Sequence, residues 1–392
     1  MRVHAYELLS RSGVDNFFAG GDADQAASRV IADSALLLDL DDLVSGKRAF
    51  VNVTREVVLN GWVEIFPRDS LVVELLETIE PDEELVEACR RLREQGYAIA
   101  LDDFVYREDL EPLIELAEIV KVDFLQSGTT ERRETAERLR DRGVRLLAEK
   151  IETHEMLQEA RQLGYSLFQG FFFSKPVIVS ANDVPGYKLH VMEVLNEIYR
   201  PELDFEGMES VIKRDMALAY KLLRYINSAG FGLRQPVDSI RRALIFLGQN
   251  EIRKWATLMA MTTLGHDRPE ALVPHAVTRG RFCETVARWF DLEPRSQDLF
   301  LMGVFSIIDA VLGRPLEEIL NPLPVSEEIK RALTGESSPL SPAFDFCLDH
   351  ERGDWEALDR RLPGVEEASV TRAYVDAVAW TNEILRAAAQ AD

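Results

Sequence analysis

Short apolar runs alternate with segments of helical spacing through the first half of the chain. Seven of these runs have the length of buried strands, and several of them end in polar residues. They lie at residues 3–9, 49–53, 71–76, 98–102, 119–123, 144–148 and 165–168. Helical spacing occurs between them at 24–38, 83–94, 110–117, 130–142 and 154–163. This alternation predicts a parallel α/β fold, and it favours a TIM-type (β/α) barrel over an open sheet.

The second half of the chain follows a different pattern. After a turn-rich stretch at 179–186, apolar residues recur at spacings of three and four, and no strand pattern interrupts them. Helices are predicted at 188–199, 206–213, 215–227, 238–247, 249–262, 270–290, 295–310, 315–320, 325–334, 341–350, 354–359 and 365–388. We therefore expect an α/β barrel domain over residues 1–180 and an all-α domain over residues 187–388.

Composition narrows the class of protein. The 392 residues carry a net charge of −23, which argues against a nucleic-acid-binding surface. A small anionic ligand remains compatible, because a bound divalent cation inverts the field locally. The three cysteines (Cys89, Cys283 and Cys347) are too scattered for a zinc site or a disulfide framework. With no signal peptide and no apolar run near the ~20 residues of a membrane span, we expect a cytoplasmic protein without a membrane segment.

The candidate chemistry lies where the predicted strands end. Asp102 and Asp103 follow the run at 98–101, and two adjacent acids converge on one point only where a strand turns. For an isolated pair, a helix N-cap with a solvated neighbour would be the simpler explanation. However, the other strands also end in ligand-type residues. The full set is Glu7, Asn52, Glu74, Asp102, Asp103, Lys121, Asp123, Glu149, Glu152 and Gln169.

Such a set implies a metal site. An apolar barrel interior accommodates so many charges only if they pair or bind a cation. Oxygen ligands without His or Cys select Mg²⁺, Mn²⁺ or Ca²⁺ over zinc. Two such ions would suit phosphodiester hydrolysis, with water attacking in line and a lysine steadying charge. No GxGxxG or GxxxxGK[ST] motif supports a dinucleotide fold or a P-loop.

Residues 3–176 resemble the EAL family of cyclic di-GMP phosphodiesterases, whose fold is a modified (β/α)8 barrel. The motifs that carry the resemblance are Tyr-Glu-Leu-Leu-Ser-Arg at 6–11, Phe-Val-Asn-Val at 50–53, Val-Val-Glu-Leu-Leu-Glu at 72–77, Asp-Asp-Phe at 102–104, Val-Lys-Val-Asp at 120–123, Ala-Glu-Lys-Ile-Glu-Thr at 148–153 and Phe-Gln-Gly-Phe-Phe-Phe-Ser-Lys-Pro at 168–176. Leu8 stands where the family has alanine.

The resemblance implies a role for each of these polar residues. One cation, Mg²⁺ or Mn²⁺, would be held by Glu7, Asn52, Glu74 and Asp102, and a second by Asp103, Asp123 and Glu149. Glu149 would also be the general base, and Lys121 the catalytic lysine. Substrate contacts would come from Arg11, Glu152 and Gln169. A homodimer is one assembly that the resemblance allows.

Two departures from the family threaten turnover more than they threaten binding. The family follows Asp-Asp-Phe with Gly-Thr-Gly, a flexible loop that orders the second metal and the dimer interface. Here the continuation is Val-Tyr-Arg-Glu at 105–108, which we expect to be stiffer or redirected. Family members also open with an extra strand, and if Met1 is the true start, the barrel has seven strands and an edge that needs covering.

The second half resembles the HDOD domain, which looks like an HD phosphohydrolase without its metal residues and serves as an output or interaction module. The resemblance spans about residues 187–385 and is carried by 222–230, 240–248, 252–255 and 300–309. The only His-Asp pair, His266-Asp267, has the surroundings of a surface turn. Asn227 and Ser228 could bind a ligand, but capping a helix end explains them equally well. We expect no catalytic site here.

Together, the two resemblances lead to a bacterial signalling protein. The leading hypothesis is a catalytically weak or inactive EAL domain that senses cyclic di-GMP and a metal ion and is coupled to a protein partner through the HDOD domain. The competing hypothesis is an active phosphodiesterase that produces linear pGpG, with Glu149 as the base. A third is a scaffold whose barrel is empty. Hydrolysis that is abolished by Glu149→Ala separates the second hypothesis from the first.

Overall fold

The computed structural model describes residues 1–8, 44–174, 195, 199, 205–214, 216–227, 235–266, 268–321, 323 and 325–389. Within it the chain forms two compact units. One consists of Val3–Lys175, and the other of Pro176–Asp392 together with Met1–Arg2. Arg11, the expected helix at 24–38 and the turn-rich stretch at 179–186 lie outside the described residues. Each unit is considered by itself.

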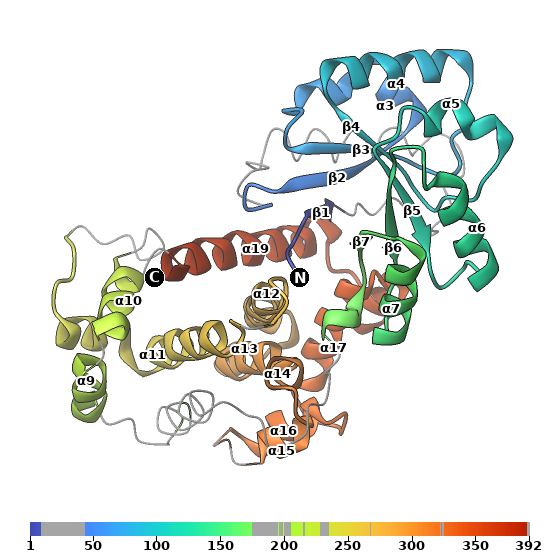
Figure 1. Cartoon of the computed structure of the whole chain (residues 1–392). Helices are drawn as coiled ribbons and strands as arrows, with labels where there is room; N and C mark the ends of the chain where they lie inside the picture. The colour runs from blue at the N-terminus through green and yellow to red at the C-terminus, as the bar shows by residue number, and fades with distance from the viewer. Residues whose placement is uncertain are drawn as a thin grey trace. The chain divides into compact units, whose positions relative to one another are not determined.

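The first unit is built on a curled sheet of seven parallel strands (Figure 1). The strands are β1 (Ala5–Leu8), β2 (Arg48–Val53), β3 (Leu71–Leu75), β4 (Ala98–Leu101), β5 (Ile119–Asp123), β6 (Arg145–Glu149) and β7 (Leu167–Phe168). Each strand pairs with its neighbour in the sequence, so the order in the sheet is the order in the chain. This curled, TIM-like half-barrel confirms the α/β fold class predicted from the alternation of apolar runs and helical segments.

Helices connect the strands and pack on the outer side of the sheet (Figure 1). They are α3 (Arg55–Leu59), α4 (Glu83–Gln95), α5 (Glu111–Ile114), α6 (Thr129–Leu139) and α7 (His154–Leu163), with 3-10 turns at Trp62–Ile65, Glu108–Leu110 and Phe171–Ser174. Helix α4 shows why they form where they do. Asp82 caps its first turn by accepting from the Leu85 amide at 2.8 Å, and Gly96 ends it at φ 97°.

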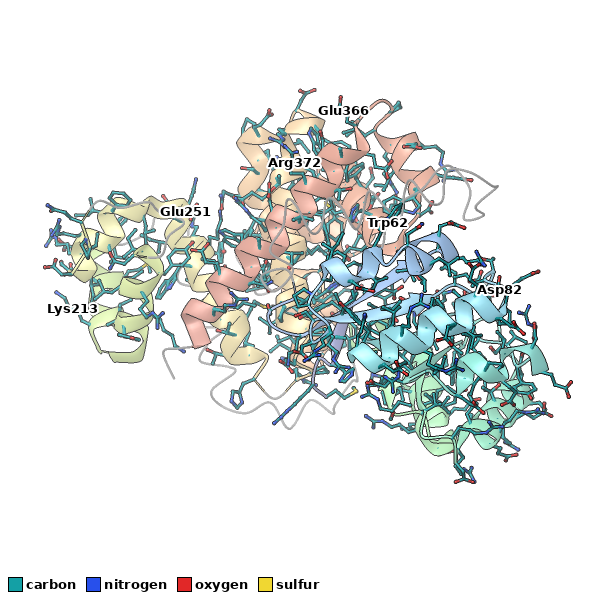
Figure 2. All side chains as sticks on the ribbon, turned by 90° about the horizontal axis from the view of Figure 1, so that it is seen from above. Trp62, Asp82, Lys213, Glu251, Glu366 and Arg372 are labelled. Atoms are coloured by element: carbon teal, nitrogen blue, oxygen red, sulfur yellow. The ribbon has the colours of Figure 1, made fainter. Side chains whose placement is uncertain are left out.

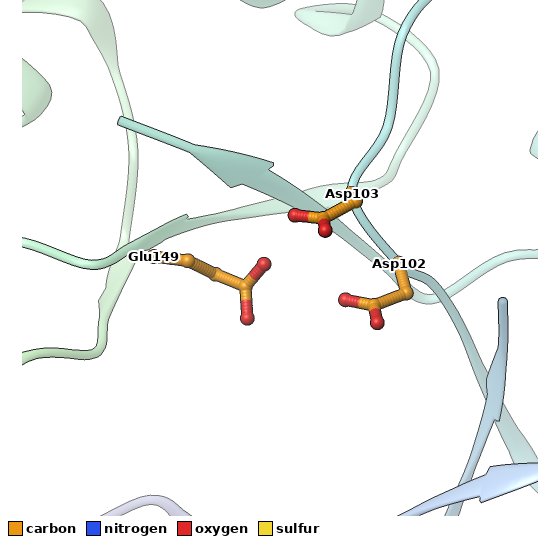
Figure 3. Close-up of side chains that lie close together, drawn as sticks. All are labelled: Asp102, Asp103 and Glu149. Atoms are coloured by element: carbon orange, nitrogen blue, oxygen red, sulfur yellow. The ribbon is translucent and has the colours of Figure 1, made fainter. Parts of the chain in front are cut away.

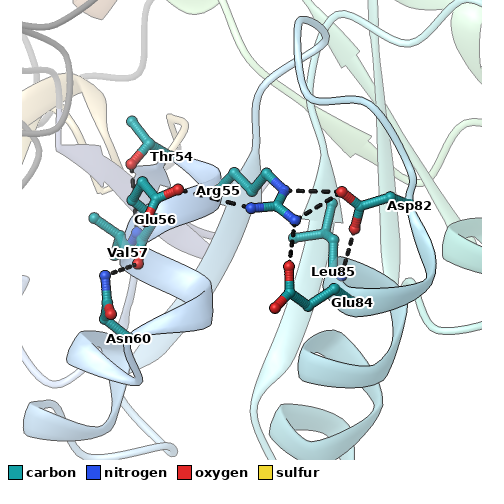
Figure 4. Close-up of polar contacts among 8 residues, drawn as sticks. All are labelled: Thr54, Arg55, Glu56, Val57, Asn60, Asp82, Glu84 and Leu85. Atoms are coloured by element: carbon teal, nitrogen blue, oxygen red, sulfur yellow. Dashed lines mark hydrogen bonds and ion pairs between the residues drawn. The ribbon is translucent and has the colours of Figure 1, made fainter.

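An ion-pair network joins α3 to α4 on the surface of this unit (Figure 4). The Arg55 guanidinium lies 2.7 Å from both Asp82 Oδ2 and Glu84 Oε2. The Asp82 side chain lies at the surface of this unit (Figure 2). Exposed pairs of this kind contribute little stability, so the packing of the helices on the sheet holds the unit together.

The two faces of the curled sheet carry separate apolar layers. The outer layer lies between the sheet and the helices and includes Val51, Val73 and Ile99. The inner layer is smaller and consists of Phe50, Val72, Ala98, Ala100, Ile119 and Leu147. Because successive side chains of a strand point to opposite faces, residues two positions beyond an inner apolar residue also face the inside of the barrel.

The second unit is all-α over its described residues, as the sequence predicted. Its helices are α9 (Phe205–Arg214), α10 (Met216–Ile226), α11 (Ile240–Leu264), α12 (Leu272–Val286), α13 (Ser296–Phe305), α14 (Ile308–Leu312), α15 (Leu316–Leu320), α16 (Glu327–Leu333), α17 (Ser341–Arg352), α18 (Trp355–Arg361) and α19 (Glu367–Ala389), with 3-10 turns at Ala287–Phe290 and Glu293–Arg295. Helix α11 bends at Gly248, where φ is 69°, and this bend separates the two helices expected there. None of the helices in the described part of the chain combines the length and apolar character needed to cross a membrane.

The sequence predicted one continuous helix over 295–310, and this prediction is wrong. The chain leaves helical geometry at Ile307, where φ is −128°, so α13 and α14 are separate helices. Just before the break, Ser306 Oγ donates to the Gly303 carbonyl at 2.7 Å and accepts from Arg279 Nη1 at 2.7 Å. A side chain that bonds its own backbone competes with the helical hydrogen bonds, and no apolar periodicity reports this competition.

Candidate functional site

Strand alternation assembles the polar residues at one end of the barrel interior. Asn52 lies two residues beyond Phe50 of the inner layer, and Glu74 lies two beyond Val72. The same step leads from Ala5 to Glu7, from Ala100 to Asp102, from Ile119 to Lys121, from Leu147 to Glu149 and from Leu167 to Gln169. Because all seven strands are parallel, these positions share the carboxyl edge of the sheet.

Lys121 stands at the centre of this polar end. Its Nζ lies 2.7 Å from Glu149 Oε1, 2.8 Å from Asp102 Oδ1 and 3.5 Å from Glu7 Oε1, and it also contacts Glu74 Oε1. The side chains of Lys121 and Glu74 are 1% and 0% exposed. Carboxylates in or directly after four strands therefore surround one ammonium group that is almost wholly buried.

This cluster is short of positive charge. Burial raises the pKa of Glu149 to about 8, and the Asp102 carboxylate adds to the rise while Lys121 opposes it. Burial likewise raises the pKa of Glu74, reinforced by the nearby Glu7 carboxylate. For Lys121, burial acts to lower the pKa, but the surrounding carboxylates outweigh it and raise the pKa above its ordinary value. The raised pKa values of Glu149 and Glu74 mean that burial disfavours their ionised forms even beside Lys121, so an additional positive charge would stabilise the ionised cluster.

Three buried oxygens of the cluster have no hydrogen-bond partner among the described residues. They are Asn52 Oδ1, Glu74 Oε2 and Asp103 Oδ1. Leaving such atoms unpaired costs free energy in a protein interior unless a ligand meets them. Amide and carboxylate oxygens are the donors that Mg²⁺ and Mn²⁺ take in proteins. The residues present therefore fit a hard divalent cation.

Asp102, Asp103 and Glu149 form the tightest group of acids (Figure 3). One carboxylate oxygen from each lies within 4.8 Å of the other two. Asp103 reaches this place because the chain turns there with φ 37°, which brings two adjacent acids to the same region. The alternative use of this pair as a helix cap is wrong, since the N-cap position of the next 3-10 turn is Arg107, several residues further on.

Asp123 and Lys150 form a second, separate pairing at the same end. Asp123 Oδ1 accepts from the amides of Leu125 at 2.6 Å and Gln126 at 3.0 Å, and Asp123 Oδ2 accepts from Lys150 Nζ. Burial acts to raise the pKa of Asp123, but Lys150 and the two amides outweigh it and hold the pKa below its ordinary value. Sequence reasoning missed Lys150, because strand alternation places it on the opposite face from Glu149.

The last strand closes the site onto the first. Gln169 Nε2 donates to Glu7 Oε2 at 2.6 Å, so the two edges of the curled sheet approach each other here. Gly170 makes this possible, because a Cβ at this position would lie 2.3 Å from the Ile151 carbonyl oxygen, and its φ is 137°. Glu152, predicted to contact substrate, is exposed just beyond β6.

The segment at 105–108, where this chain departs from the EAL pattern, is tied to neighbouring helices. Tyr106 Oη donates to Glu111 Oε1 at 2.8 Å, and the Arg138 guanidinium lies 3.8 Å from the centre of the Tyr106 ring. A cavity of about 200 Å³ lies beside it and is lined in part by Asp103 and Val105. These contacts tie Tyr106 to α5 and α6, while the greater stiffness expected from the loss of two glycines stays a prediction.

The helical unit carries charged groups that pair with one another. Arg279 Nε donates to Glu351 Oε1 at 2.9 Å, and the side chains are 7% and 5% exposed. His275 Nε2 lies 2.6 Å from Arg279 Nη2. Among the described residues, the only cluster of three or more metal-type ligands is the acidic group in the barrel. His266 is exposed, while its neighbour Asp267 lies outside the described residues.

Asn227 has a structural role at the end of α10. Its Nδ2 donates to the carbonyls of Leu223 at 2.7 Å and Val237 at 2.8 Å, and its Oδ1 accepts from the Val237 amide at 2.7 Å. Both ends of the amide are thus engaged by the backbone. Of the two interpretations open for this residue, the capping role is what the structure shows, while Ser228 lies outside the described residues.

The buried imidazole of His350 gives the helical unit a predicted pH dependence. Burial lowers the pKa of His350 from 6.5 to about 4, against the opposing charge of Glu351. Between these values the unfolded chain binds a proton that the folded chain does not, so stability is full above pH 6.5 and falls toward pH 4. Between pH 7 and pH 4 the free energy of unfolding of wild type falls, and we expect this fall to be about 2–3 kcal/mol smaller in His350→Phe. Urea unfolding followed by tryptophan fluorescence measures it, because four of the five tryptophans lie in this unit.

The exposed His266 provides the control for this prediction. His266→Asn should leave the pH dependence of the wild type unchanged. An equal loss of stability on acidification in wild type and His350→Phe would show that another group sets the pH dependence.

Comparisons with known proteins agree with both halves of the chain. The EAL domain family model matches residues 60–176, and the HDOD domain family model matches residues 184–312. The uncharacterized protein YuxH of Bacillus subtilis is 33% identical over 394 residues, which cover 98% of this chain and 96% of YuxH. The cyclic di-GMP phosphodiesterase CdgJ of Vibrio cholerae is 32% identical over 386 residues, covering 97% and 89% of the two chains.

A likeness is also found among solved structures. The YkuI protein of Bacillus subtilis, which has an EAL domain and was solved with cyclic di-GMP and calcium, is 20% identical at a TM-score of 0.34. The match covers 56% of this chain and 55% of that chain. On the strength of the full-length relatives, the chain belongs to the family of proteins that join an EAL domain to an HDOD domain. This confirms the two resemblances drawn from the sequence.

Proposed function

We propose that this chain is a cytoplasmic bacterial signalling protein that responds to cyclic di-GMP. Its barrel binds the dinucleotide with a divalent cation and hydrolyses it slowly, and its HDOD domain passes the bound state to a protein partner. The observation that carries the proposal is the convergence of Glu7, Glu74, Asp102 and Glu149 on Lys121. Groups that are so costly to bury together are maintained where they serve a ligand or a reaction.

The cation would be Mg²⁺ or Mn²⁺. Its ligands would come from the unpartnered oxygens of Asn52 and Glu74 together with Asp102 and Glu7. A divalent ion there would supply the positive charge that the cluster lacks and would attract the phosphates of an anionic dinucleotide to an otherwise acidic protein. This resolves the apparent conflict between a net charge of −23 and a phosphate-bearing ligand.

The residues of this chain divide the remaining tasks of hydrolysis. Glu149 would take the proton of the attacking water as the P–O3′ bond breaks, with a bound cation offsetting the burial that raises its pKa. Lys121 would stabilise negative charge on the phosphoryl oxygens. Arg11, Glu152 and Gln169 would contact the substrate, and linear pGpG would be the product. We propose slow turnover because Asp123, expected to hold a second ion, is engaged by Lys150.

Isothermal titration calorimetry and chromatography of the reaction mixture test this proposal on the full-length, metal-stripped chain. We expect cyclic di-GMP to bind when Mg²⁺ or Mn²⁺ is present, and pGpG to form at well below the ~1 s⁻¹ at which typical enzyme turnover begins. Failure to bind either metal or dinucleotide would contradict the proposal and favour a scaffold.

A second candidate is a phosphodiesterase that works at an ordinary rate. It is favoured by the full-length likeness to CdgJ, a relative named for that activity. Multiple turnover at or above ~1 s⁻¹ in the same chromatographic assay would establish it in place of the slow regulator.

A further inference from the structure

Lys150 adopts a backbone conformation that a lysine rarely takes. Its φ is 53°, in the left-handed region that side chains with a Cβ avoid. Of the four described residues other than glycine with positive φ, Asp103 and Lys150 both belong to the acidic end of the barrel. A conformation of this cost persists at a functional site when the surrounding structure holds it in place.

The strained conformation sends the Lys150 ammonium group back over the site. Its Nζ donates to Asp123 Oδ2, while the charges of Asp103 and Glu149 act on it from nearby. Asp123 Oδ1 is engaged by the amides of Leu125 and Gln126. Both oxygens of Asp123 therefore have partners, and one of those partners already carries a positive charge.

Two ligands expected to hold the first metal ion differ from Asp123, because each has an oxygen without a partner. Asn52 Oδ1 and Glu74 Oε2 are buried without a partner in the described part of the chain. The exposed fraction of the Glu74 side chain is 0%. The site thus offers open oxygens for one divalent ion at Asn52 and Glu74. Of the second expected set, Asp103 Oδ1 is also open, but the Asp123 position at β5 is filled.

We propose that the Lys150 ammonium group is a resident cation that takes the place of a second divalent ion, so that the site binds a single one. The inference rests on the proposed function only in requiring that the acidic cluster binds a divalent ion. A second ion beside Asp123 would meet a like charge a few ångströms away, and it would have to displace the lysine from its only carboxylate contact described here.

The experiment counts the ions bound per chain rather than the activity. The metal-stripped full-length protein is titrated with Mn²⁺, and bound and free ion are separated by electron paramagnetic resonance. Wild type should bind one Mn²⁺ with a spectrum of an isolated ion. Lys150→Gly removes the charge and relieves the backbone strain, and it should bind a second ion at least about tenfold more tightly than wild type does. The spectrum should then show spin coupling between two neighbouring ions.

Two controls separate the effect of the lysine charge from the effect of relieving the backbone strain. Lys150→Arg keeps the positive charge and should still bind one ion. Ser45→Gly relieves positive φ (51°) at a turn that precedes β2, away from the site, and should also bind one. Two ions of similar affinity in wild type, or one ion in Lys150→Gly, would overturn the inference and remove the reason given for slow turnover, while leaving the proposed binding of cyclic di-GMP and a divalent ion intact. No bound Mn²⁺ in any variant would overturn the proposed function, and the inference with it.

Discussion

Glu149→Gln is expected to lower the rate of cyclic di-GMP hydrolysis by about 10²- to 10⁴-fold, the usual contribution of a general base. The amide keeps the size of the side chain and can still accept a hydrogen bond from Lys121, which lies 2.7 Å from Glu149 Oε1. It cannot take a proton from water. Dinucleotide affinity should therefore fall much less than turnover. Chromatography of pGpG under single-turnover conditions measures the hydrolysis rate, and calorimetry measures the dinucleotide affinity.

Glu94→Gln is the matched control, because the same chemical change is made on an exposed face of α4. Its turnover should equal that of wild type. Unchanged turnover in Glu149→Gln would show that another group takes the proton. A wild type that binds cyclic di-GMP but forms no pGpG would make the barrel a receptor and remove the role of Glu149 as a base.

The gathering of polar residues at one end of the barrel could be predicted from the sequence, because strand alternation strongly constrains which side chains face inward. Once the run 71–75 is a strand with Val72 facing inward, Glu74 must face inward too. Parallel strands then bring Glu74 and Asn52 together, and these two residues are paired in the register of β2 and β3. No knowledge of the side-chain conformations is needed for this step.

Lys150 shows what such reasoning cannot reach. By alternation alone it points away from Glu149, onto the opposite face of the strand. The positive φ at Lys150 ends the alternation and returns the side chain to Asp123. Nothing in the local pattern signals that conformation, because it is unfavourable in isolation and is held by tertiary contacts. The role of Asn227 could not be predicted for the same reason, since its hydrogen bonds depend on Val237, ten residues later and beyond the end of α10.

Lys121→Met should destabilise the metal-free barrel by about 3–5 kcal/mol, the usual cost of removing one partner from a buried ion pair. Methionine has a similar length, so the loss is mainly one of charge. It leaves Glu74 and Glu149, already short of positive charge, without the ammonium group that both contact. Hydrogen exchange followed by mass spectrometry on the peptides of β3–β6 localises the change to the barrel, where a global unfolding curve would mix the two units.

The same variant tests whether a divalent ion can substitute for the lost ammonium group. Mn²⁺ should slow hydrogen exchange in the barrel more in Lys121→Met than in wild type, because the ion supplies the positive charge that the variant has lost. Lys213→Met, on the exposed surface of α9, should change exchange in the barrel by no measurable amount. If Lys121→Met is as stable as wild type without metal, the carboxylates must be protonated in the folded state, and the cluster would then have little electrostatic attraction for a cation.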